Sequence, residues 1–334
     1  MNPSDHHILV LGGAGYIGSH TVKLLSDNGY KITVLDNLSF GHVEAIDTSI
    51  VNFVEGDLGD VELLTTLFET HRFSAVVHFA AFAFVGESVV EPAKYYDNNV
   101  ARPLRLLDVM RKFDCKKFIF SSTCASYGNP QYVPIDEKHP QAPINPYGNS
   151  KLMLEMILKD YEKAYDIKHV ILRYFNASGA SVDGSIGEDH DPETHLIPLV
   201  LEAAVGEREH ITVFGTDYDT ADGSCIRDYI HVNDLGRAHV LGLEKLINEN
   251  KSVICNLGTG VGVSVKEIID VVEEVTGKEV PVVYGDRRPG DPSELVADPS
   301  YALEQLGWKA DFMDIKDTIA SAWKWKSGER NGHY

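Results

Sequence analysis

The fold of this chain is decided near its start, by the stretch Ile8-Leu9-Val10-Leu11-Gly12-Gly13-Ala14-Gly15-Tyr16-Ile17-Gly18. A short apolar run, a glycine-rich turn and a helical pattern through Leu25 follow one another, which is the context that gives this glycine spacing its meaning. Gly12 permits the tight turn, Gly15 lets the backbone approach a pyrophosphate, and Gly18 allows close helix packing. The amino end of the helix offers N–H groups to phosphates. The stretch therefore predicts a dinucleotide-binding unit rather than a bare glycine connection.

Two further strands bring carboxylates to the same edge. Lys31 to Leu35 reads as a strand that ends in Asp36, close to the ~20 residues after the glycines at which a carboxylate binds ribose hydroxyls. Because a carboxylate repels a 2′-phosphate, the pattern favours NAD over NADP. A strand over residues 51–58 contains Asp57, for which two roles stay open: holding the adenine end of the cofactor, or capping a helix that starts near Val61.

More β-α units follow in order. Ala75 to Ala81 is an apolar run that predicts a strand covered on both faces, with small residues at its end against which a dinucleotide can lie. His78 is expected to be buried there rather than catalytic. A helix is predicted over 93–112 and a strand over Lys117 to Thr123. Repeated units of this kind predict an α/β fold with a doubly wound, parallel, Rossmann-type sheet.

The chemistry is predicted at Tyr147-Gly148-Asn149-Ser150-Lys151. Residues four apart share one helix face, so Tyr147 and Lys151 lie one turn from each other. A free Tyr titrates near pH ~10, and a neighbouring ammonium is expected to lower that pKa by roughly one to three units. Thr123, at the end of its strand, is placed to reach the same substrate oxygen. The pair predicts a proton-transfer group, with an ordinary amphipathic helix as the alternative.

Composition narrows the class of protein. A chain of 334 residues can form one large domain plus a smaller lobe. Its net charge of −20 argues against nucleic acid and anionic membrane surfaces as partners. The four cysteines match no metal-ligand spacing, so free thiols, no metal and a reducing compartment are expected. With a polar start, no signal peptide and no apolar run near ~20 residues, we expect a cytoplasmic enzyme.

The second half supplies cations and a further lobe. Arg227 and the pair Arg287-Arg288 stand in segments that read as loops, where they suit bidentate phosphate contacts or, equally, structural ion pairs. Strands over 253–258 and 280–284, with their helix, are expected to build the smaller lobe. The site is then expected in the cleft between the two lobes.

The helix expected from Gly148 to about Tyr165 is apolar on more than one face. A surface helix needs only one buried stripe. The excess favours a subunit interface in a homodimer, shared with the helix over 93–112. Wider burial within the monomer is the alternative.

Taken together, the motifs resemble those of the extended short-chain dehydrogenase/reductase family. In the first half these are Gly12 to Gly18, Asp36-Asn37-Leu38, Ser121-Ser122-Thr123 with Tyr127-Gly128, and Tyr147 with Lys151. The second half is similar to the 4-epimerases of UDP-hexoses within that family, through Arg173-Tyr174-Phe175-Asn176, His195-Leu196-Ile197-Pro198, Arg227-Asp228-Tyr229-Ile230-His231-Val232 and Arg287-Arg288-Pro289-Gly290-Asp291. The resemblance covers nearly the whole chain in order.

The resemblance implies interconversion of UDP-galactose and UDP-glucose by NAD-dependent transient oxidation at sugar C4, with hydride return to the opposite face. It implies Tyr147 as the catalytic base, Lys151 as its electrostatic partner and Thr123 as the hydroxyl that binds the 4-oxygen. NAD contacts are implied for Gly12, Gly15, Tyr16, Ile17, Gly18, Asp36, Asn37, Asp57, Leu58, Phe79, Ala80, Ala81, Asn98, Ser121, Tyr147, Lys151 and Tyr174. UDP-hexose contacts are implied for Thr123, Tyr147, Asn176, His195, Leu196, Arg227, Arg288, Asp291 and Leu295. Residues 1–175, with returning segments near 231–260, form the implied NAD-binding domain, and 176–334 mainly the UDP-sugar lobe.

Three positions depart from the family pattern. Ala83 replaces a Lys that contacts the nicotinamide ribose in some members, Leu295 replaces a bulky Tyr beside the sugar, and His195 replaces an Asn. Leu295 leaves room for an N-acetyl group, so UDP-N-acetylglucosamine/galactosamine, UDP-xylose or UDP-glucuronate stay open as substrates. A nucleotide-sugar 4,6-dehydratase would need an Asp-Glu pair where this chain has Cys124-Ala125. A non-catalytic NAD-binding protein is disfavoured by the intact Tyr147 set.

Overall fold

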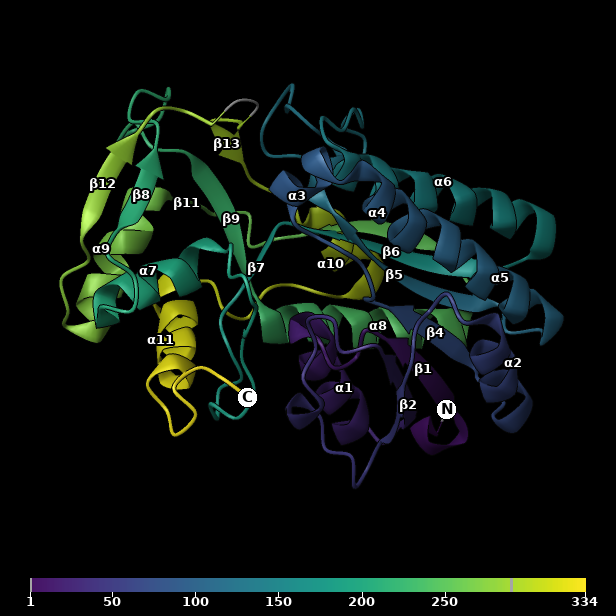
Figure 1. Ribbon diagram of the computed structural model, residues 1–334. Helices are drawn as coiled ribbons and strands as arrows, with labels where there is room; N and C mark the ends of the chain where they lie inside the picture. The colour runs from purple at the N-terminus through teal and green to yellow at the C-terminus, as the bar shows by residue number, and fades with distance from the viewer. Residues whose placement is uncertain (1, 289–290) are drawn as a thin grey trace.

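The computed structural model describes residues 2–288 and 291–334 as two lobes, each built around β-strands (Figure 1). The strands are β1 His7–Leu11, β2 Lys31–Asp36, β3 Asn52–Glu55, β4 Ala75–His78, β5 Lys117–Thr123, β6 Lys168–Tyr174, β7 Asn176–Ser178, β8 Ile211–Phe214, β9 Ile226–His231, β10 Val253–Leu257, β11 Gly262–Ser264, β12 Val282–Gly285 and β13 Glu294–Leu295. The α-helices are α1 Tyr16–Asp27, α2 Val61–Thr70, α3 Val85–Val90, α4 Pro92–Tyr96, α5 Arg102–Lys112, α6 Pro146–Tyr165, α7 Leu196–Val205, α8 Val232–Glu249, α9 Val265–Thr276, α10 Ser300–Leu306 and α11 Ile315–Lys326. Short helical turns are η1 Pro3–Asp5, η2 Val43–Ala45, the π-helix η3 Asp97–Ala101 and η4 Cys124–Ser126.

The larger lobe is a seven-stranded parallel sheet in the order β10-β6-β5-β4-β1-β2-β3. Alternate side chains of β1 face opposite ways because a strand has a period of two. Ile8 and Val10 pack with α1 and α8, whereas Leu9 and Leu11 pack with α2, α5 and α6. The predicted doubly wound α/β fold is thereby confirmed, with helices on both faces of the sheet (Figure 1).

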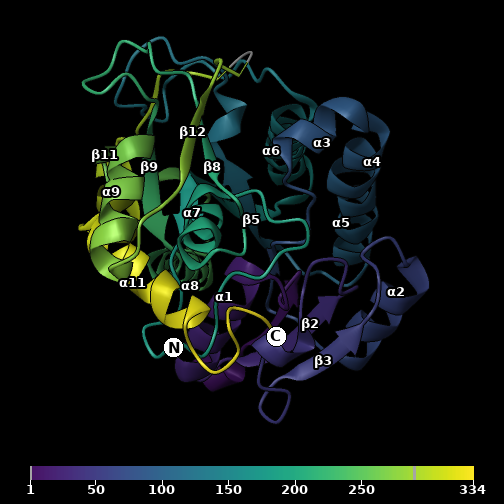
Figure 2. The same cartoon turned by 60° about the vertical axis from the view of Figure 1, so that its left-hand side comes forward.

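For one strand the prediction from the local pattern was wrong, whereas the domain bounds implied by the resemblance keep residues 231–260 with the NAD-binding part. The residues expected to help build the smaller lobe at 253–258 form β10, which pairs with β6 at the edge of the main sheet. Helix α8 crosses one face of the sheet before β10, and a crossover of this kind returns the chain to a parallel sheet. The smaller lobe instead contains β9 with β7, β11 and β13, the pair β8–β12, and the helices α7, α9 and α11 around a separate core (Figures 1 and 2).

Several local predictions agree with the structure. His78 is 1% exposed within β4, as expected, and all four cysteines are free thiols. The helix expected over 93–112 is interrupted by a π-helical turn at Asp97–Ala101. Among the described residues, no helix combines the length and the apolar character that a membrane crossing requires.

Candidate active site

The glycine turn lies where β1, β2 and β4 end side by side, since Leu11 is in register with Leu35 and His78. Gly12 has a φ of +73°, and a Cβ there would lie 2.6 Å from the backbone nitrogen of Ala80. At Gly18 a Cβ would lie 2.1 Å from the carbonyl oxygen of Gly12. No side chain fits at either position without moving backbone.

The amino end of α1 faces a cavity. Gly15 is the N-cap and makes no side-chain cap, and a Cβ added there would meet only the Gly12 oxygen, at 3.4 Å. The first N–H groups of a helix lack intrahelical partners and carry the positive end of its dipole. Glycine therefore leaves open the face at which an anionic group such as a pyrophosphate can approach.

The two strand-end carboxylates have different surroundings. Asp36 accepts hydrogen bonds from Ala14 N and Leu38 N, both at 2.9 Å, so it also holds the glycine turn. Burial raises the pKa of Asp36 above its usual value, although those two hydrogen bonds lower it.

Asp57 accepts from Gly59 N at 2.7 Å and pairs with Arg102 at 2.7 Å. Burial alone would raise the pKa of Asp57, but these contacts and a hydrogen bond from Asn37 hold that pKa below its usual value. The helix cap is Asp60, which accepts from Leu63 N at 2.9 Å. The capping role left open for Asp57 was therefore wrong.

A cavity of about 500 Å³ collects most of the predicted cofactor residues. It is lined by Gly12, Gly15, Tyr16, Ile17, Gly18, Asp36, Asn37, Asp57, Leu58, Phe79, Ala80, Ala81, Asn98, Tyr147, Lys151 and Tyr174. Ser121 is the exception: it is 2% exposed and lies behind the cavity wall, with its hydroxyl 3.1 Å from His239 Nε2.

Tyr147 and Lys151 lie on the first turns of α6, which begins at Pro146 and is capped by Asn145 through Gly148 N at 2.8 Å. Thr123 closes β5, and it lines the same cavity as Tyr147 and Lys151. Helix and strand thus bring together the three residues that the sequence predicted to act as a set.

The predicted direction of the tyrosine pKa was wrong. Burial raises the pKa of Tyr147 to about 12, even though the Thr123 hydroxyl lowers it. Burial also lowers the pKa of Lys151 to about 7, so the amine is not a permanent cation at neutral pH. Lys151 Nζ donates to the Ser121 carbonyl at 2.8 Å and lies 5.9 Å from the centre of the Tyr147 ring.

A buried network that sequence reasoning missed supports this set from behind. Glu155 Oε2 accepts from Arg173 Nη2 at 2.6 Å, and Glu155 Oε1 accepts from the Ser122 hydroxyl at 2.6 Å. Arg173 Nη1 donates to Tyr127 Oη at 2.9 Å. The available signal was one charged residue inside the apolar run 170–174 and another among the apolar residues of 152–158.

A second cavity, of about 640 Å³, adjoins the first and shares Asn176, His195 and Asp291 with it. Arg227, Arg288 and Leu196 line the second cavity, whereas Thr123 and Leu295 line the first. The predicted substrate residues therefore follow one continuous surface that begins beside Tyr147.

The arginines differ from the sequence expectation. Arg227 lies on β9 rather than in a loop, and its guanidinium pairs with Asp291. Arg287 is held by Asp217 at 2.6 Å, whereas the Arg288 guanidinium lies 4.0 Å from the centre of the Phe214 ring. Pro289 and Gly290 of the predicted motif lie outside the described residues.

Sequence reasoning also missed part of the cavity wall. Phe40, Phe82 and Phe84 line it, together with Glu188 and His190. The aromatic residues carry no periodic signal because they come from two irregular segments. Ala83, the position at which some family members have Lys, also lines this cavity.

His195 is the N-cap of α7 and points its Nδ1 at acidic neighbours. Although burial lowers it, the carboxylates of Glu188 and Glu193 raise the pKa of His195 to about 10.

A Rossmann-type sheet with a glycine cradle and a Tyr–Lys pair beside a strand-end Thr defines a dinucleotide-dependent enzyme of the short-chain dehydrogenase/reductase class. The profile of the NAD dependent epimerase/dehydratase family matches residues 8–258. The chain belongs to that family.

Relatives named UDP-glucose 4-epimerase are similar to this chain over nearly their whole length. The UDP-glucose 4-epimerase of Streptococcus mutans is 50% identical, over 98% of both chains, and that of Halalkalibacterium halodurans is 49% identical, over 98% of this chain and 97% of the other. The crystal structure of UDP-glucose 4-epimerase from Brucella ovis in complex with NAD is 51% identical, with a TM-score of 0.93, and the match covers 96% of this chain and 98% of that one.

Proposed function

We propose that this chain interconverts UDP-galactose and UDP-glucose, with NAD as its cofactor. The observation that carries the proposal is the meeting of Tyr147, Lys151 and Thr123 in the cavity that the glycine turn also lines, with an arginine-bearing cavity next to it. Relatives named for this activity, at about half identity over the full length, support it.

The residues fit the cofactor. The glycine cradle excludes side chains at Gly12 and Gly18, and the N-terminal N–H groups of α1 remain available to phosphate. Asp36 stands where a ribose would lie and disfavours a 2′-phosphate. NAD, when bound, supplies the acceptor and donor of hydride for the sugar carbon.

The protein's own groups move the proton and hold the substrate. Tyr147 Oη takes the proton of the sugar 4-hydroxyl and later returns it, and the hydroxyl of Thr123, which lines the same cavity, binds that oxygen. Arg227 and Arg288 bind the pyrophosphate, since guanidinium matches phosphate geometry. Anchoring at the nucleotide leaves the hexose free to present either face to the same base.

In our proposal, one lobe binds the cofactor and the other mainly binds the substrate. Residues 1–175, with the returning segment 231–260, hold NAD in our proposal, and residues 176–334 mainly hold the UDP-sugar. A lack of net redox change allows the cofactor to stay bound between turnovers. We place the protein in the cytoplasm, in line with its four free thiols.

The test is Tyr147→Phe, assayed for conversion of UDP-galactose to UDP-glucose without added cofactor. Loss of a positioned base is expected to lower kcat about 10²–10⁴-fold, while the absorbance of bound NAD(H) persists. Tyr301→Phe removes a hydroxyl from a tyrosine that lies on α10, outside both cavities, and serves as the control. Unchanged turnover in Tyr147→Phe would refute the role of Tyr147 as base.

A specific observation also favours N-acetylated substrates. Leu295 lines the first cavity at a position where some other family members carry a bulky Tyr beside the sugar. We propose that UDP-N-acetylgalactosamine is accepted as well as UDP-galactose. Assays of the two sugars side by side decide this, and turnover of the plain hexose alone contradicts it.

We further propose a homodimer that pairs α5 and α6 with their copies. On α6, Met153 is 43% and Met156 57% exposed, and Tyr165 at its end packs under the Arg111 guanidinium of α5 at 3.7 Å. Met156→Glu should convert the dimer to a monomer in sedimentation equilibrium. Met313→Glu, at a methionine 50% exposed on the other lobe, should not, and a wild-type monomer would end this proposal.

A further inference from the structure

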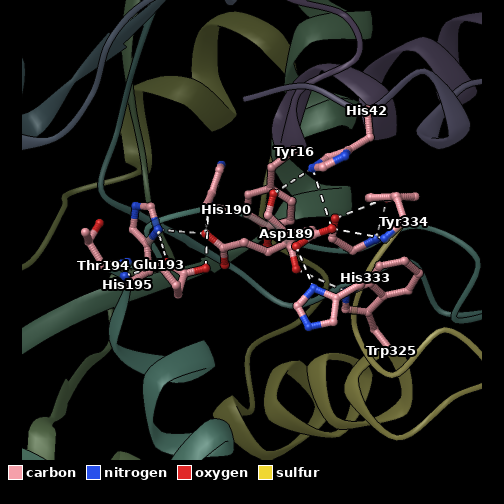
Figure 3. A network of polar contacts seen from close by, with 12 residues as sticks. Tyr16, His42, Asp189, His190, Glu193, Thr194, His195, Trp325, His333 and Tyr334 are labelled. Atoms are coloured by element: carbon pink, nitrogen blue, oxygen red, sulfur yellow. Dashed lines mark hydrogen bonds and ion pairs between the residues drawn. The ribbon is translucent and has the colours of Figure 1, made fainter. Parts of the chain in front are cut away.

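Four side chains that take no part in the proposed proton transfer converge in the segment between β7 and α7. Glu188, His190, Glu193 and His195 each offer one carboxylate oxygen or imidazole nitrogen, and these four atoms lie within 4.8 Å of one another. Figure 3 shows the side chains of His190, Glu193 and His195 turned toward a common point.

The separations suit a metal ion. His195 Nδ1 lies 2.8 Å from Glu188 Oε1 and 3.0 Å from Glu193 Oε1. His190 Nδ1 lies 3.2 Å from Glu188 Oε1 and 3.7 Å from Glu193 Oε2. Ligands at ~2.0–2.1 Å from a tetrahedral Zn²⁺ are separated from one another by ~3.3–3.4 Å. The observed values fall on both sides of that distance.

Hydrogen bonding among the described residues leaves part of the cluster without a partner. Glu188 Oε1 and His190 Nδ1 are buried and make no hydrogen bond there, although they lie within ion-pair distance of each other. The Glu188 side chain is only 6% exposed and that of Glu193 only 8%. Buried carboxylates of this kind are normally paired with hydrogen-bond donors or coordinate metals.

The surroundings hold the ligands in place, as the outer shell of a metal site does. Glu193 Oε1 accepts from the backbone nitrogens of Thr194 at 2.6 Å and His195 at 2.7 Å, which orients the carboxylate. The rings of Tyr16 and Phe84 stand edge-on to His190 at 6.3 and 6.2 Å.

The intervening residue, Asp189, points away from the cluster. Its carboxylate lies 2.9 Å from His333 Nδ1, accepts from Tyr334 N at 3.0 Å, and faces His42 (Figure 3). The C-terminal end of the chain thus braces the outer side of the loop, while the residues before and after Asp189 face inward.

We propose that Glu188, His190, Glu193 and His195 bind one divalent transition-metal ion of the zinc class. Two imidazoles with two carboxylates favour Zn²⁺ or a similar borderline ion over Mg²⁺ or Ca²⁺, which prefer oxygen ligands. Two carboxylates also neutralise a dication, which suits a buried position.

The ion has a structural role: it ties residues 188–195 together at the wall shared by the two cavities. His195 uses Nδ1 in the cluster, so its Nε2 remains available for the substrate contact that the family resemblance implies. The site takes no part in proton transfer by Tyr147, and its existence does not depend on which sugar is turned over.

The test uses the intact purified protein, stripped with a chelator and then titrated with Zn²⁺ alone and with Co²⁺ alone. We expect about one Zn²⁺ per chain, a higher Tm with zinc than with chelator, and the intense visible bands of four-coordinate Co²⁺. His190→Gln and Glu193→Gln should each lower zinc affinity by at least the ~10–100-fold that even an outer-shell change causes. His333→Gln, which removes an exposed imidazole from the same loop environment, should bind zinc as the wild type does.

Three results would overturn the site: less than stoichiometric zinc in the wild type, a weak six-coordinate cobalt spectrum, or equal affinity in His190→Gln and the wild type. Far-UV circular dichroism in chelator shows whether each variant is folded. If a variant is not, the wild-type stoichiometry and cobalt spectrum decide alone. Loss of turnover in Tyr147→Phe leaves all these readouts unchanged, which separates this proposal from the proposed function.

Discussion

Replacing Lys151 by Met should make the nucleotide-free protein more stable while abolishing most of its activity. Lys151 is 4% exposed, and burial lowers its pKa from 10.5 to about 7. At ~1.4 kcal/mol per pKa unit, this shift lowers the free energy of unfolding by about 5 kcal/mol near pH 7, because the unfolded chain binds the proton more tightly than the folded one. Losing the hydrogen bond to the Ser121 carbonyl offsets about 1.5–3 kcal/mol.

The net gain is therefore about 2–3.5 kcal/mol near neutral pH. With an unfolding entropy of ~2.1 cal/mol/K per residue, this corresponds to a rise of about 3–5 °C in Tm for a chain of 334 residues. The sign with pH follows from the direction of the shift. Between pH 7 and 10.5 the unfolded state binds the extra proton, so wild-type stability rises with pH across that window, and the variant lacks this rise.

Urea unfolding of the nucleotide-free protein at several pH values between 7 and 9.5 measures both effects. Lys163→Met is the matched control, since Lys163 lies on the same helix with 79% of its side chain exposed. A Lys151→Met protein that is less stable than the wild type at pH 7, or that keeps the wild-type slope with pH, would refute the reasoning.

Three other changes test other parts of the structure. Glu155→Gln should lower the free energy of unfolding by about 3–5 kcal/mol because it leaves Arg173 buried without its carboxylate; urea unfolding measures this, and no recovery in the double variant with Arg173→Met would contradict it. Asp36→Ala should weaken NAD binding about tenfold and reduce the ratio of the affinities for NAD and NADP. Calorimetry with both nucleotides measures this, and an unchanged ratio would show that Asp36 does not select the cofactor. Leu295→Tyr should reduce turnover of UDP-N-acetylgalactosamine about tenfold more than that of UDP-galactose, in parallel assays; equal losses would remove Leu295 from sugar selection.

Local pattern predicted most of the main sheet. The strand predicted over 117–123 matches β5 residue for residue, and the glycine turn stands where the β1–α1 connection requires it. Both are local features: alternation, apolar runs and glycine at a positive φ are set by neighbours in sequence. The lobe to which Val253–Leu257 belongs is not local, because pairing with β6 depends on the path of α8 between them.

The sequence predicted that Tyr147 and Lys151 lie close together, but it did not predict how far the two side chains are shielded from water. A spacing of four residues places Tyr147 and Lys151 on one face of α6, whatever surrounds them. Which carbonyl the amine reaches, and how much water remains near the phenol, depends on β5 and on the cavity wall. The expected fall in the pKa of Tyr147 failed for this reason.

The cluster at 188–195 escaped prediction for a related reason. Its ligands follow one another at spacings of two, three and two residues, which match neither the helical nor the strand period. Only the fold turns Asp189 outward and the other four side chains inward. In a loop, the spacing of potential ligands along the sequence does not determine which way their side chains point, because the tertiary structure sets that direction.

Burial causes both pKa shifts in the Tyr147 site, and both favour the uncharged form of the side chain. Burial raises the pKa of Tyr147 to about 12 and lowers that of Lys151 to about 7, so both groups move toward their neutral forms. A phenol in this state is a poor base, and the free chain therefore does not store a ready phenolate. Because a positive charge brought into the same cavity favours the phenolate and disfavours the ammonium, the acidity of Tyr147 depends on what the cavity holds. The base that the sequence assigned to a Tyr–Lys spacing is thus a property of the loaded cavity, not of the helix alone.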